Sequence, residues 1–139
     1  MPKPLLATAL LLAALGCSTK PPPAQLSGKV TFKGEPVPAG FISFTPDVAK
    51  GGLGPIQVFQ INNGVYDSAK QDPPGIVPGS YLIQIEGFDG KRIPMYGQGK
   101  QIFNPIRDEI VVPDGVSEKD FAIPESAGQN VKIQPTADT

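Results

Sequence analysis

The chain has 139 residues, with 12 basic and 13 acidic side chains, a formal net charge of −1 and no histidine. No basic field is present to attract nucleic acid, so we expect no nucleic-acid partner. The lack of histidine removes the commonest general base, and a single cysteine excludes zinc sites built from His and Cys. These absences weigh against histidine-dependent catalysis; we expect no metal ion, no cofactor and no catalytic residue.

The start of the chain has the order of a secretory signal. Lys3 supplies a positive charge, Leu5–Leu15 is almost entirely apolar, and small Gly16 precedes Cys17. The apolar run would form a helix about 16 Å long, whereas a membrane span needs about 20 apolar residues. We therefore predict a signal-peptide helix over residues 1–16.

Leu15-Gly16-Cys17 resembles the bacterial lipobox, in which the cysteine is lipidated and becomes the new N-terminus. The resemblance implies acyl chains such as palmitate on Cys17 and a body anchored to a membrane of the cell envelope, facing the periplasm or the exterior. Ser18 is similar to the residue found there in outer-membrane cargo. An ordinary secretory signal with a stray cysteine and a membrane span are the alternatives.

Residues 17–24 are predicted to be the lipidated cysteine and a tether, because Pro21–Pro23 favour the extended polyproline II conformation. Such a spacer would hold the domain about 20 Å from a membrane, at about 3.1 Å per residue. One domain is predicted over residues 25–135, followed by a disordered tail over 136–139.

Within this domain apolar residues alternate with polar ones, which is typical of half-buried strands. In the first strand Leu26, Gly28 and Val30 share one face, and Asn62-Asn63-Gly64 later predicts a hairpin turn. The predicted strands span residues 26–33, 40–45, 56–61, 65–68, 80–88, 109–112, 120–123 and 131–133. Turns are predicted over 34–38 and 69–79, with a loop over 46–55. The fold class is therefore all-β, as a single β-sandwich of about seven to eight short strands.

Short motifs follow one another between Leu26 and Phe88. They are Gly28-Lys29-Val30, Gly34-Glu35-Pro36-Val37, Ile42-Ser43-Phe44, Asn63-Gly64-Val65-Tyr66 and Val77-Pro78-Gly79-Ser80-Tyr81. Their order resembles that of carboxypeptidase regulatory-like domains. The resemblance implies a transthyretin-like (prealbumin-like) sandwich with an accessory or adhesive role. We expect Tyr66 and Tyr81 to lie in the core, with partners for their hydroxyls.

Residues 89–107 lack a clear period and hold no acidic residue between Asp89 and Asp108. Long segments of this kind on a rigid scaffold often bind partners. The candidate binding surface consists of Lys91, Arg92, Tyr96, Lys100, Phe103 and Arg107. It would meet an envelope protein, a glycan or a lipid head group. The alternative is a solvated loop whose Tyr96 and Phe103 lie beneath the sandwich.

These patterns predict a lipid-anchored envelope protein with a non-catalytic domain for binding or structural scaffolding. A hydrolase that uses carboxylates alone, a carbohydrate-binding module and a wall-associated spacer are the alternatives. The acidic groups Asp108-Glu109 and Glu118-Lys119-Asp120 are expected to be solvated strand ends. No EF-hand spacing suggests calcium.

Overall fold

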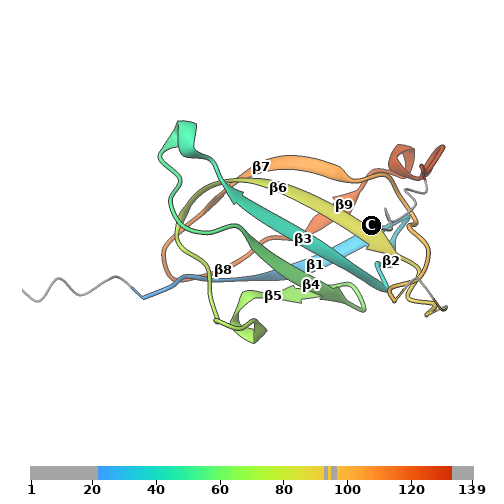
Figure 1. Cartoon of the computed structure of the whole chain (residues 1–139), viewed down its shortest axis with the longest axis horizontal. Helices are drawn as coiled ribbons and strands as arrows, with labels where there is room; N and C mark the ends of the chain where they lie inside the picture. The colour runs from blue at the N-terminus through green and yellow to red at the C-terminus, as the bar shows by residue number, and fades with distance from the viewer. Residues whose placement is uncertain (1–21, 93, 95–96, 133–139) are drawn as a thin grey trace, which may run out of the picture.

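The structure is a computed structural model that describes residues 22–92, 94 and 97–132. The predicted signal-peptide helix, Cys17 and the predicted tail lie outside these residues, as does the predicted domain end at residue 135. The described part contains strands and short 3-10 helices (Figure 1). The strands are β1 (Gln25–Phe32), β2 (Glu35–Pro36), β3 (Ala39–Pro46), β4 (Gln57–Asn62), β5 (Val65–Asp67), β6 (Gly79–Phe88), β7 (Ile106–Val112), β8 (Val116–Glu118) and β9 (Phe121–Ile123). The 3-10 helices are η1 (Val48–Lys50), η2 (Ser68–Lys70) and η3 (Glu125–Gly128).

The strands form one curled sheet in the order β2-β1-β5-β4-β3-β6-β7, and neighbours in this order are antiparallel. Strands β8 and β9 run parallel to β1 and pair with its first and second halves. The sheet curls around its own inner face (Figure 1). The prediction of an all-β fold is confirmed, and the curled sheet is consistent with a β-sandwich.

The inner face of the sheet carries the apolar residues that the alternation predicted. Ile42 and Phe44 of β3 are fully buried, and Ile83 and Ile85 of β6 lie beside them in register. The Phe44 ring packs against the rings of Phe59 at 4.8 Å and Tyr81 at 5.9 Å between centroids. Such aromatic contacts add to the free energy gained from burial itself.

Two tight turns at one end of the sheet fit against each other. Lys33-Gly34 and Asn63-Gly64 all have positive φ, between 48° and 77°, as two-residue hairpin turns require. The Gly64 N–H donates to the Val37 carbonyl, and a Cβ at Gly64 would lie 2.5 Å from the Pro36 Cβ. The hairpin predicted at Asn63-Gly64 is confirmed.

Several predicted boundaries are wrong. The turn predicted over 34–38 contains β2, because the Lys33-Gly34 turn folds Glu35 back to pair with Phe32. Strand β7 begins at Ile106 and not at residue 109, since Ile106 pairs with Ile85. The strand predicted over 131–133 is absent at its described residues 131 and 132.

The tether also ends earlier than predicted. Ala24 is buried in the core, and its backbone exchanges two hydrogen bonds with Ile76 at 2.8 and 2.9 Å. Pro23 packs near Gly75, where a Cβ would lie 2.7 Å from the proline Cβ. The domain therefore includes residues that the sequence assigned to the spacer.

Both predicted core tyrosines are buried and hydrogen-bonded, as expected. The Tyr66 hydroxyl donates to the Lys119 carbonyl at 2.6 Å, and the Tyr81 hydroxyl donates to the Val77 carbonyl at 2.7 Å. Burial raises the pKa of both hydroxyls, and at Tyr66 the Asp120 carboxylate raises it further. The folded state therefore favours the neutral phenols.

We expect Tyr66→Phe to lower the free energy of unfolding by about 1 kcal/mol, because the Lys119 carbonyl loses its donor. The pKa of Tyr66 is higher in the folded state than its usual value of 10.0. The hydroxyl therefore contributes fully to the free energy of unfolding below about pH 10, and this contribution is lost as pH rises further. Urea unfolding at about pH 8 and about pH 11 should therefore show a smaller alkaline loss in the variant than in the parent. An equal alkaline loss in both proteins would contradict this linkage.

Candidate binding surface

The segment from Asp89 to Pro105 between β6 and β7, here called the basic loop, is closed at its base by Asp89. One carboxylate oxygen of Asp89 accepts hydrogen bonds from the N–H groups of Lys91 at 2.9 Å and Lys100 at 3.1 Å. The Asp89 N–H donates to the Lys100 carbonyl, and the Gly90 N–H donates to the Gln98 carbonyl. The acid at the start of the loop thus joins residues 89–91 to residues 98–100.

Phe103 lies in the core and does not belong to a binding surface. Its ring is 0% exposed and packs on Phe32 at 5.2 Å between centroids. Gly87 of β6 makes room for this ring, because a Cβ there would lie 2.3 Å from a Phe103 ring carbon. The placement of Phe103 in the candidate binding surface is therefore wrong, and its burial agrees with the part of the alternative that concerns Phe103.

Asn104 fixes the far end of the basic loop to the segment after β9. Its amide nitrogen donates to the carbonyls of Ala127 at 3.2 Å and Gln129 at 3.0 Å. Its amide oxygen accepts from the Lys132 N–H at 3.2 Å. Phe103 and Asn104 together attach the loop to the body of the domain.

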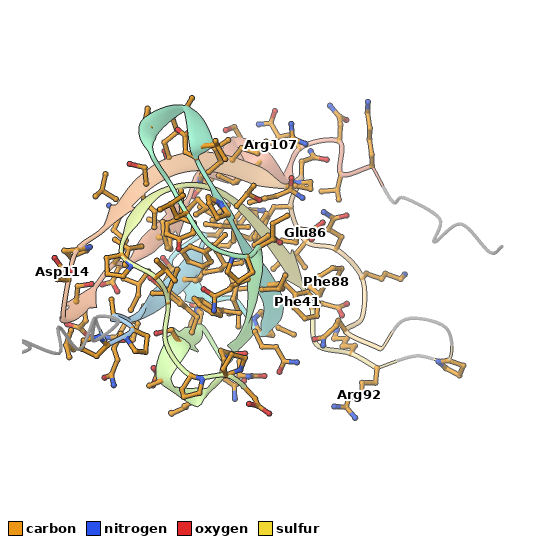
Figure 2. All side chains as sticks on the ribbon, turned by 60° about the vertical axis from the view of Figure 1, so that its left-hand side comes forward. Phe41, Glu86, Phe88, Arg92, Arg107 and Asp114 are labelled. Carbon is orange, nitrogen blue, oxygen red and sulfur yellow. The ribbon has the colours of Figure 1, made fainter. Side chains whose placement is uncertain are left out.

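The predicted cationic side chains fall into two separate places. Lys91, Arg92 and Lys100 are exposed on the basic loop, whereas Arg107 lies on β7. Figure 2 shows Arg92 on the loop, well apart from Arg107. Tyr96 lies outside the described residues. The structure therefore brings together three of the six predicted residues.

Arg107 belongs to a groove on the outer face of the sheet. Its Nε donates to the Gln84 amide oxygen at 3.1 Å. The groove has a volume of about 470 Å³ and is lined by Thr45, Leu82, Ile83, Gln84, Arg107, Asp108 and Glu109. Its outward opening suits a shallow contact better than an enclosed ligand.

The carboxylates of this groove have structural partners. The Asp108 side chain accepts from the Glu109 N–H at 2.8 Å, and the Glu109 carboxylate pairs with Lys50. The hydrogen bond from Lys50 to Glu109 is the main reason why the pKa of Lys50 is raised. The Asp108 carboxylate thus binds the backbone of β7, and the Glu109 carboxylate holds η1 beside β7 through Lys50.

An aromatic pair on the outer face was missed by the sequence reasoning. The rings of Phe41 and Phe88 meet edge to face at 6.2 Å, and Glu86 lies opposite Phe41 in the register (Figure 2). The available signal was Phe41 itself, a large apolar residue on the polar side of an alternating strand. This pair supports the start of the basic loop, because Phe88 directly precedes Asp89.

Among residues 22–92, 94 and 97–132, no three His, Cys, Asp or Glu side chains group closely enough to hold a metal ion. No helix in the same residues has the length and apolar character of a membrane span.

Comparison with known proteins gave no match of the chain to a family model, a curated protein or a solved structure. The lipobox and the carboxypeptidase regulatory-like motifs therefore stay predictions from the sequence.

We expect Asp89→Ala to loosen the basic loop, because the N–H groups of Lys91 and Lys100 lose their shared acceptor. Trypsin cleaves after Lys and Arg, so limited proteolysis at Arg92 and Lys100 reports on opening of the loop. A loss of about 1 kcal/mol should raise the cleavage rate about fivefold. Asp114→Ala is the matched control, because Asp114 is exposed far from the loop (Figure 2). Equal cleavage of both variants would contradict the role of Asp89.

Proposed function

We propose that this chain is a lipid-anchored protein of the cell envelope whose non-catalytic β domain presents the basic loop to an anionic envelope partner, a glycan or a protein. The observation that supports it most is the placement of the loop. The chain enters the domain at Ala24, beside Ile76 and close to the start of β6. The basic loop follows the other end of this strand.

Strand β6 sets the distance between these two ends. It has 10 residues, which at about 3.3 Å each span about 33 Å. An anchor at Cys17 would place the first end of β6 near the membrane and the basic loop away from it. This orientation favours contact between the loop and molecules of the envelope.

The charge distribution on the loop supports an anionic partner. Between described residues, the ion pairs involve Lys50 and Lys70, and none joins Lys91, Arg92 or Lys100 to a carboxylate. The Asp89 carboxylate faces backbone N–H groups. The loop therefore presents three exposed cations on a chain whose net charge is −1.

The anchor is tested by Cys17→Ser in the native host. We expect the parent protein to fractionate with membranes and to carry acyl groups on an N-terminal Cys17. The variant should lose this mass increment and leave the membrane fraction, because acyl chains supply the anchoring free energy. Parent protein with an unmodified Cys17 or an intact leader would contradict the proposal.

The role of the loop is tested by reversing its charge. The test variant carries Lys91→Glu, Arg92→Glu and Lys100→Glu. The control variant carries Lys29→Glu, Lys70→Glu and Lys119→Glu, which change the net charge equally at exposed positions elsewhere. We expect crosslinking in intact cells, followed by mass spectrometry, to lose its captured partners in the test variant alone. Both variants should keep their membrane fraction and melting temperature, and equal capture by both would contradict the role of the loop.

A further inference from the structure

Large apolar side chains are exposed at the end of the domain where the chain enters it. Five of them are between 64% and 80% exposed: Val48, Leu53, Ile56, Val111 and Val116. We call this set the apolar end. The other large apolar side chains that are exposed among the described residues, Val58, Val65 and Leu82, are less exposed, at 43% to 51%.

Backbone contacts place the segments of the apolar end side by side. The Gln25 N–H donates to the Gly115 carbonyl at 2.9 Å, so the incoming chain lies next to Val116. The ion pair between Lys50 and Glu109 holds η1 beside the end of β7 that carries Val111. Figure 1 shows η1 at the upper left, and the β7–β8 turn and the incoming chain lower on the same left-hand side.

A groove lined mainly by proline extends this apolar surface. Its volume is about 460 Å³, and its lining residues are Pro22, Pro23, Pro55, Gln57, Pro73, Pro74, Gly75, Ile76, Val77 and Pro78. The lining joins the incoming chain to the loop before β4 and to the turn before β6. Proline rings thus add a second apolar surface beside the incoming chain.

The charges near the apolar end do not favour binding to an anionic partner surface. Lys50 and Lys70 pair with carboxylates, and Asp72 and Asp114 are exposed. A partner that binds here by charge would have to be cationic, whereas the exposed side chains are chiefly apolar. The surface suits a partner that takes up apolar groups with little dependence on charge.

The length of chain before the domain limits what this end can reach. Five residue steps separate Cys17 from Pro22, which span at most about 18 Å when fully extended. A lipid on Cys17 would therefore hold Pro22, where the chain enters this end of the domain, within about 18 Å of the bilayer. This distance is an upper limit. Apolar side chains that reach the bilayer gain free energy when they are buried in it.

We propose that the apolar end docks on the lipid bilayer, with Leu53 and Val116 at the boundary between head groups and acyl chains. This inference rests on the lipid anchor of the proposed function and adds a second contact to it. The domain then lies against the membrane and is not held away from it by a spacer. Two membrane contacts, the lipid and the apolar end, fix the orientation of the basic loop.

The test uses the lack of tryptophan in this chain, because an introduced tryptophan is then the single reporter. Leu53→Trp and Val116→Trp report on the apolar end, and Glu35→Trp is the control in β2 at the opposite end. Each acylated full-length mature protein is reconstituted in phosphatidylcholine vesicles with brominated acyl chains. We expect blue-shifted, strongly quenched emission from the first two reporters and unquenched emission from the control. Quenching should persist at high salt, since the contact is apolar.

The outcomes separate the anchor from the docking. Intact mass of the parent protein from its native host shows whether Cys17 is acylated, and an unmodified Cys17 would overturn the anchor and the docking with it. With Cys17 acylated, unquenched emission from Leu53→Trp and Val116→Trp would overturn the docking alone. Emission that is blue-shifted but unquenched would assign the apolar end to a second protein surface and would also overturn the proposal.

Discussion

Strand β1 holds the two halves of the curled sheet together, because it pairs with four other strands along its length. Its pairing depends on Gly28, where a Cβ would lie 2.0 Å from the Lys119 carbonyl oxygen. The absence of a side chain lets the β8–β9 connection cross close to β1, and the Tyr66 hydroxyl donates to the same carbonyl. Gly28 therefore belongs to the alternating pattern of β1, allows the close approach of the β8–β9 connection, and lies beside the hydrogen bond of Tyr66.

The path of β1 also separates the two ends of the domain. Its first residue lies next to Gly115 at the apolar end, and its last residue, Phe32, packs on Phe103 beneath the basic loop. Because the strand is rigid, it holds the apolar end and the basic loop at a fixed distance from each other. Any anchor on the incoming chain therefore determines where the basic loop points.

The sequence predicted the elements whose order depends on local pattern. The alternation over β1, β3 and β6 identified their buried faces, and Asn63-Gly64 identified a hairpin. It did not predict β2 or β8, which have 2 and 3 residues and form through pairing with β1. Neither strand buries an apolar residue, whereas β5 and β9, which are also short and were predicted, bury Tyr66 and Phe121. The partner of β8 lies far away in the chain, at the start of β1, whereas β2 follows β1 directly through the Lys33-Gly34 turn.

The difference between local sequence pattern and contacts formed only on folding also explains which residues of the candidate binding surface could be predicted. A run of cations without acids is a local property, so Lys91, Arg92 and Lys100 could be selected from the sequence. The burial of Phe103 depends on the space above Gly87, 16 residues earlier in the numbering, which only the folded sheet reveals. With Phe103 in the core, the exposed charged side chains of the basic loop among the described residues are Lys91, Arg92 and Lys100. These three cations are the residues on which the proposal of an anionic partner depends.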